Sequence, residues 1–178
     1  MQYAERVGAL FATADEIALA WRARAELVEM LTVRAAFEWR DDAAFREELA
    51  VAVDRCTGSE RLPIVLLDEE ARTLMANRAF ERATGHRREE LIGRPAAGLT
   101  GGDDAEEDRR QFDDLVEGRT EYVDVVARRV LADGSERVYA SHRGAVRAAD
   151  GTFRCSVGVG RPLHLTDEDR SSFVPPDH

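Results

Sequence analysis

Residues 121–160 read EYVDVVARRVLADGSERVYASHRGAVRAADGTFRCSVGVG, and this stretch decides the class of fold. Apolar and polar residues alternate along three runs, which is the pattern of half-buried strands. Asp133-Gly134 and Asp150-Gly151 separate the runs, and an Asp-Gly pair between two such runs strongly favours a tight hairpin. The stretch therefore predicts three consecutive antiparallel strands. Their expected bounds are 121–131, 136–147 and 152–160.

Upstream of this meander, the pattern predicts a second hairpin and then helices. The apolar runs 64–67 and 73–76 flank a turn at Asp68-Glu69-Glu70. Asn77 is placed to cap a helix that ends at Gly85, and a further helical turn follows over 88–92. We expect a loop over 98–102 and a helix over 103–117. Two strands, a helical middle and three strands predict an α+β domain with an antiparallel sheet.

The expected helix over 103–117 is strongly acidic, with eight acids and two arginines. Phe112, Leu115 and Val116 supply its inner side. The acids predict either a solvated outer face or an acidic surface that binds a partner.

The N-terminal region, residues 1–58, is predicted to be helical. Its first part has apolar residues at alternating spacings of three and four, with a single break at Arg24, which is a heptad pattern. Such a stripe fits an amphipathic helix packed on its own domain or a helix that forms a dimer, and we expect the dimer. The candidate interface residues are Val7, Leu10, Ala14, Ile17, Trp21, Val28 and Leu31. A second helix, within 42–56, is expected to dock on an outer sheet surface formed by Val138, Ala140 and Gly144, either of the same chain or of the dimer mate.

Residues 62–161 together resemble a PAS domain. The matching segments begin with Pro63-Ile64-Val65-Leu66-Leu67-Asp68 and continue with 76–80, 84–85, 88–95 and 132–135. Asp150-Gly151 before the final strand completes the set. The resemblance implies a PAS-like five-stranded antiparallel sheet with helices on one face, preceded here by N-terminal α-helices. It also implies a pocket between sheet and helices, and a role in sensing and regulated protein contact. Residues 162–178 are expected to form a flexible tail.

The same resemblance indicates which residues a PAS domain needs to bind each kind of cofactor. Flavin-adduct PAS domains resemble one another in an asparagine-cysteine-arginine run, where this chain has Leu99-Thr100-Gly101-Gly102-Asp103. Haem-binding relatives usually supply a histidine from the long helix, and 103–117 has none. Cys56 and Cys155 are too few for an iron–sulfur cluster, which needs four ligands. The sequence therefore has no haem, flavin-adduct or iron–sulfur signature, and the cofactor is left open.

Two registers are open for the strand over 136–147. Hydrophobicity alone would turn Val138, Ala140, His142 and Gly144 toward the pocket, whereas the resemblance places Tyr139, Ser141, Arg143 and Ala145 there. A pocket arginine needs an anion or a carboxylate partner, because a buried unpaired charge is costly. The candidate pocket residues are Phe112, Val125, Tyr139, Ser141, Arg143, Cys155 and Val157.

Composition excludes several kinds of function. All 25 basic residues are arginine, so chemistry that needs a lysine amine is excluded. The net charge of −10 argues against binding to nucleic acid or to anionic membranes. No pair of nucleophile and base and no metal cluster occurs at motif spacing, so we do not expect an enzyme. With no signal peptide or apolar span in the sequence, we expect a cytoplasmic protein.

The sequence thus predicts a non-enzymatic sensor that binds a small ligand or a partner. It would pass the event to an unidentified signalling protein by contact through dimerising N-terminal helices. The alternative is a constitutive adaptor or structural interaction protein with a collapsed, ligand-free pocket.

The heptad stripe gives a first prediction. The full chain should be a homodimer, because the PAS-like region would not cover the apolar stripe that includes Ile17 and Trp21. Deletion of residues 1–40 should make the protein monomeric in light scattering. A monomeric full chain at micromolar concentration would contradict the prediction.

Overall fold

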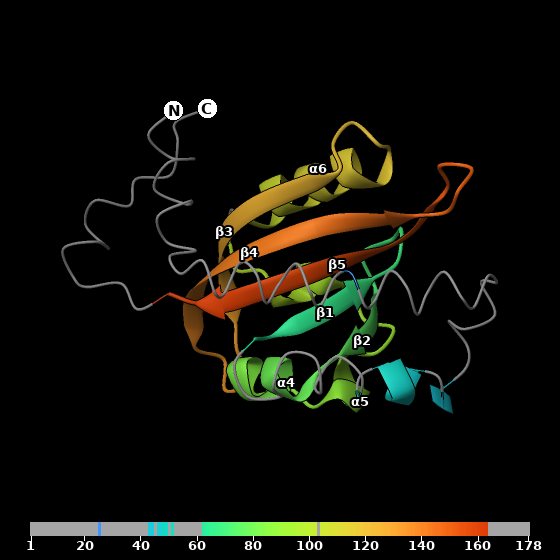
Figure 1. The fold of residues 1–178 in the computed structure, drawn as a ribbon. Helices are drawn as coiled ribbons and strands as arrows, with labels where there is room; N and C mark the ends of the chain where they lie inside the picture. Colours follow the sequence, from blue (N-terminus) through green and yellow to red (C-terminus); the bar gives the residue numbers. More distant parts are fainter. Residues whose placement is uncertain are drawn as a thin grey trace.

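The computed structural model describes residues 62–102 and 104–163, together with 25, 43–44, 46–49 and 51. Five strands and four helical segments make up its main domain (Figure 1). In chain order they are β1 (Ile64–Leu67), β2 (Thr73–Ala76), α4 (Arg78–Thr84), α5 (Arg88–Leu91), the 3-10 helix η2 (Ala96–Leu99), α6 (Asp104–Val116), β3 (Tyr122–Val130), β4 (Glu136–Arg147) and β5 (Phe153–Pro162).

The strands form one antiparallel sheet in the order β2-β1-β5-β4-β3. The meander β3-β4-β5 and the hairpin β1-β2 are both confirmed. The first strand joins the last one, with Ile64 paired to Val159 and Leu67 to Ser156. This pairing places β1 in the interior of the sheet, which explains why its side chains are almost entirely buried.

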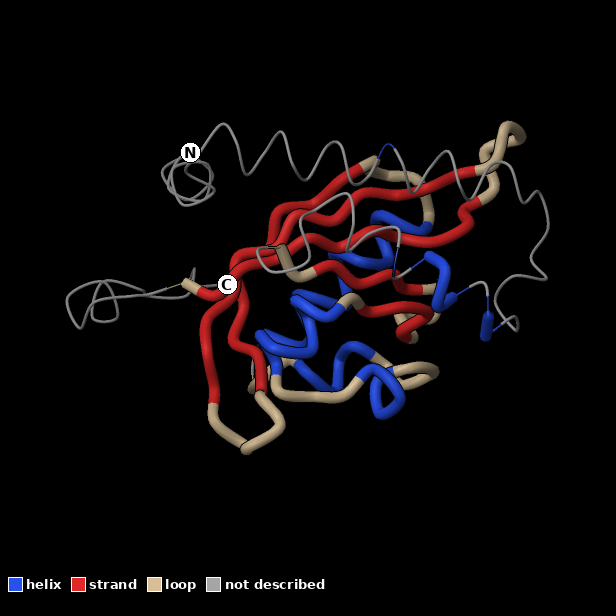
Figure 2. The backbone as a smooth tube through the Cα atoms, turned by 60° about the horizontal axis from the view of Figure 1, so that its bottom comes forward, coloured by secondary structure: helices blue, strands red, loops and turns tan. Residues whose placement is uncertain are grey.

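The helices gather on one side of the strands (Figure 2). This confirms the α+β class and the five-stranded sheet. One local expectation was incomplete, because part of the segment from Gly98 onward belongs to η2. An isolated bridge between Thr100 and Arg129 then joins the residue after η2 to β3. The connection from α5 to α6 therefore lies against the sheet near the end of β3.

The register of β4 is the one that the resemblance implied. Ser141 pairs with Val125 on β3 and with Gly160 on β5, so these three residues point to the helical side. Ala140 lies on the opposite face and is 0% exposed. Hydrophobicity could not distinguish the two faces, because both are buried.

A β-bulge in β5 reverses which of its side chains point to each face of the sheet. Arg147 pairs with Phe153, but its neighbour Val146 pairs with Cys155, so Arg154 is the extra residue. Phe153 points to the helical side, where its ring lies edge-on to that of Phe112 with centroids 6.4 Å apart. Beyond the bulge the alternation is inverted, and Cys155 points to the other face.

Asn77, the single asparagine of the chain, joins β1 to α4. Its Oδ1 accepts hydrogen bonds from the backbone N–H of Ile64 and of Phe80, each at 2.9 Å. Its Nδ2 donates to the carbonyl of Leu62 at 3.0 Å. One fully buried side chain therefore caps α4 and satisfies the start of β1.

The N-terminal predictions fall largely outside the described residues. The seven candidate interface residues between Val7 and Leu31 all do so. Of the segment 42–56, the structure describes a helical part in which Leu49 is buried and Glu47 pairs with Arg88 of α5 at 3.0 Å. This part lies beside α5 (Figure 1), which contacts β2 at the sheet edge. Within one chain, the described part of 42–56 therefore lies at the sheet edge and not on the outer surface of β4, and docking of this segment from a dimer mate stays a prediction.

The last strand is longer than expected. β5 continues through Arg161 and Pro162, and the N–H of Leu163 donates to the carbonyl of Val138 at 2.9 Å. Proline is tolerated here because it lies at the strand end. Of the predicted flexible tail 162–178, the first two residues are thus part of the sheet region, and 164–178 lie outside the described residues.

Asn77→Ala should lower the free energy of unfolding by about 2–4 kcal/mol, because it removes a helix cap and leaves buried backbone groups without partners. Urea unfolding followed by circular dichroism measures the change. Asp133→Ala is the control, since Asp133 bonds the N–H of Ser135 in an exposed turn. If both variants lost the same small amount of unfolding free energy, the proposed role of Asn77 would be contradicted.

Candidate functional site

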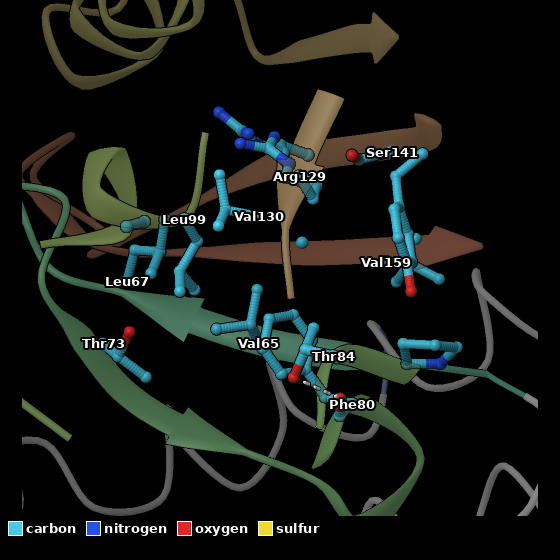
Figure 3. A pocket seen from close by; sticks show the side chains of 16 residues that line it. Val65, Leu67, Thr73, Phe80, Thr84, Leu99, Arg129, Val130, Ser141 and Val159 are labelled. Carbon is cyan, nitrogen blue, oxygen red and sulfur yellow. Dashed lines mark hydrogen bonds between the residues drawn. The ribbon is translucent and has the colours of Figure 1, made fainter. Parts of the chain in front are cut away.

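A cavity of about 60 Å³ lies between the helical side of the sheet and the helices. Its lining residues are Pro63, Val65, Leu67, Thr73, Phe80, Thr84, Ala96, Leu99, Arg129, Val130, Tyr139, Ser141, Arg143, Gly158, Val159 and Gly160. Most of the wall is apolar. In Figure 3 Arg129 lies at one end, and Thr84, which donates a hydrogen bond to the carbonyl of Phe80, lies at the other. The cavity is therefore charged at one end.

The charged end is a buried cluster around Asp108. Its Oδ1 lies 2.6 Å from Nη2 of Arg143, and its Oδ2 lies 3.0 Å from Nη1 of Arg129. Thr100 donates its hydroxyl to Oδ2 of Asp108 at 3.0 Å and accepts a hydrogen bond from Arg129. The side chains of Asp108 and Arg143 are 7% and 8% exposed. One carboxylate thus stands between two guanidinium groups away from water.

The cluster shifts the ionisation of its members. Burial alone would raise the pKa of Asp108, but the charges of Arg143 and Arg129 and the hydrogen bonds from Arg129 and Thr100 hold that pKa below its ordinary value. Burial lowers the pKa of Arg143 against the opposing charge of Asp108, and Arg129 lowers it further. A guanidinium group carries its positive charge in proteins. The cluster therefore has a net charge of +1.

Local sequence places each member of the cluster. Asp108 precedes Phe112 by four residues and Leu115 by seven, so all three share the inner side of α6. Arg143 pairs across the sheet with Gly158, whose missing side chain leaves room. A Cβ at Gly158 would lie 3.2 Å from Cγ1 of Val65 and 3.7 Å from Cγ of Arg143. Glycine at 158 thus permits the arginine stem to lie over β5.

The predicted pocket residues divide into three groups. Tyr139, Ser141 and Arg143 line the cavity. Val125 shares their face of the sheet but is not part of the cavity lining, and Phe112 belongs to an adjacent core cluster with Leu67, Ala71, Leu115, Ala145 and Phe153.

Cys155 and Val157 do not lie where the sequence placed them. The bulge at Arg154 turns both to the face of the sheet opposite the cavity, where they are 0% and 2% exposed. Regular alternation from Phe153 had suggested the cavity floor. Gly158 and Gly160 occupy that position instead.

The sequence analysis missed Thr100, Asp108 and Arg129. Asp108 was counted among the acids of a solvated helix face, although its spacing to Phe112 and Leu115 marks the inner side. Arg129 follows Val125 at an even spacing and so shares its face. The spacing from Asp108 to Phe112 and the spacing from Val125 to Arg129 were the two sequence features that indicated the cluster.

This arrangement of sheet, helices and enclosed cavity defines a sensory or interaction domain of the PAS type. Residues 59–163 match the PAS fold family, and the chain belongs to it. Proteins of this family are generally sensory or interaction modules.

Solved structures agree with the fold. The chain is similar to a PAS domain from Colwellia psychrerythraea, with a TM-score of 0.56 and 19% identity over 64% of this chain and 97% of that one. It is also similar to the PAS domain of an HTR-like protein from Haloarcula marismortui, with a TM-score of 0.53 and 19% identity over 66% and 93%. Drosophila melanogaster Cycle PAS-B with bound ethylene glycol gives a TM-score of 0.52 and 16% identity over 57% and 99%.

No curated protein matches the sequence significantly. Over the described ranges, histidine, cysteine and acidic side chains form no group that could hold a metal ion. Within the same part of the chain, no helix has the length and apolar character needed to cross a membrane.

Asp108→Asn should destabilise the protein by about 3–5 kcal/mol at neutral pH, because it leaves buried guanidinium groups without a carboxylate. The folded pKa of Asp108 is lowered, so its contribution is fully present above the unfolded value of about 3.9 and is lost as pH falls through the folded value. Urea unfolding of both proteins from pH 7 to pH 3 should therefore show the difference shrinking below about pH 4. A difference that is independent of pH would contradict this.

Proposed function

We propose that this chain is a non-enzymatic PAS sensor, which binds a small ligand in the cavity and signals to another protein by contact. The observation that supports it is an enclosed, mostly apolar cavity that ends at a charged cluster. Ligand sites commonly combine an apolar wall with a few placed polar groups. Ser141, Arg143 and Arg129 are those groups here.

The sheet offers a route from the cavity to the rest of the chain. Ser141 and Arg143 alternate along β4 with Ala140, His142 and Gly144, which face the other way. Ala140 and Gly144 are buried, and small side chains allow close packing. A ligand that moves β4 therefore changes the packing on the opposite face. In this proposal the N-terminal helices form the dimer and receive that change.

A second candidate is the constitutive adaptor with a ligand-free pocket. The observation in its favour is the cavity's volume of about 60 Å³. Pockets for drug-sized ligands are on the order of 300–1,000 Å³. In the adaptor the cavity would hold only water.

Ser141→Leu separates the two functions. Leucine should fill the cavity without unfolding the protein, because it adds few atoms to an existing space. In the sensor, mass spectrometry of the denatured wild type should find a co-purified small molecule that is absent from the variant. Thr152→Leu, at an exposed turn residue, is the matched control and should retain the molecule.

The variant should also shift the dimer affinity relative to Thr152→Leu, because filling the cavity imitates occupancy. Absence of any bound molecule in wild type, together with unchanged dimer affinity in Ser141→Leu, would favour the adaptor.

A further inference from the structure

Arg143 has hydrogen-bonding capacity that the described residues do not use. Its Nη2 lies 2.6 Å from Oδ1 of Asp108, a contact that engages one of the five N–H groups of the guanidinium. The described residues show no hydrogen-bond acceptor for its remaining N–H groups, although its side chain is only 8% exposed and lines the cavity. Buried donors normally have partners, since a donor without one is costly. The cavity end beside Arg143 therefore favours an acceptor.

The charge of the cluster specifies what kind of acceptor fits. Arg129 and Arg143 contribute two positive charges, and Asp108 is the sole carboxylate that the described residues place in ion-pair contact with them. One more negative charge would neutralise the cluster. A second would be buried without a partner, which is unfavourable. The balance favours a monoanion.

The size of the cavity and the apolar residues that line it indicate what the uncharged part of the ligand is. A volume of about 60 Å³ holds about four to six water-sized groups. Val65, Leu99 and Val130 present apolar side chains to the cavity, and of these Val65 lies farther from Arg129 than Val130 does (Figure 3). A short aliphatic group is the suitable occupant of that part.

We propose that the cavity binds a short-chain monocarboxylate with about four to six non-hydrogen atoms, the number of water-sized groups for which the cavity has room. Its carboxylate binds Arg143 and Arg129 beside Asp108, and its carbon chain lies against Val65, Leu99 and Val130. This inference rests on the ligand-binding function proposed above. It adds the chemical class and the orientation of the ligand.

The test is a titration of the full chain with sodium propionate, followed by amide chemical shifts and calorimetry. Sodium chloride at equal ionic strength, sodium sulfate and the neutral isostere propionamide are the comparison probes. Propionate should bind saturably, and propionamide should bind at least tenfold more weakly. Equal binding of propionate and propionamide, no saturable binding of propionate, or equal binding of sulfate would overturn the proposal.

Arg143→Met identifies the binding group. Methionine keeps an unbranched apolar stem and leaves a neutral pair between Asp108 and Arg129, so the variant should fold. It should weaken propionate binding at least tenfold. Arg110→Met on α6 is the matched control, since Arg110 is exposed and pairs with Glu107 at 2.7 Å, and it should bind as wild type does. Equal affinity in both variants would overturn the proposed orientation.

The outcomes separate this inference from the proposed function. A neutral co-purified molecule that binds wild type but not Ser141→Leu would refute the monocarboxylate and leave the sensor intact. No bound molecule of any kind, with no effect of Ser141→Leu on the dimer, would refute both.

Discussion

The contact of Asp108 with two arginines is the interaction on which the rest of the site depends. It joins α6 to β3 and β4 across the interior of the domain, and Thr100 connects the end of η2 to the same carboxylate. Buried ion pairs contribute little net stability compared with apolar packing, but removing one partner is costly. The cluster therefore connects α6 to the sheet at a defined position.

The two sides of the cavity are held in different ways. On the β1 side, Asn77 joins the strand to α4 through hydrogen bonds between neutral groups. On the β3 and β4 side, the contacts are between the charges of Asp108, Arg129 and Arg143.

The helices, strands and hairpins were predictable because their determinants are local, whereas the joining of all five strands in one sheet followed from the resemblance to PAS domains. Two Asp-Gly turns, one helix cap and the alternation of strands each depend on a few neighbouring residues. The site was less predictable, since Asp108 differs from the other acids of α6 only in its spacing to Phe112. The face of the sheet to which Cys155 points could not be predicted from alternation. A single extra residue in a bulge moves every later side chain of the strand to the opposite face. That residue, Arg154, has no distinguishing sequence feature.

The pairing of β1 with β5 has a consequence for how the protein is made. The strand that starts the domain lies between β2 and the strand that ends it, so it has no neighbour on one side until β5 emerges from the ribosome. Such long-range pairing is slow to form, since closing a long loop precedes the contacts that stabilise it. During synthesis, the apolar edge of β1 is therefore open to chaperones and to other nascent chains. The cavity comes into existence only with the final strand, so a truncated chain has no site at all.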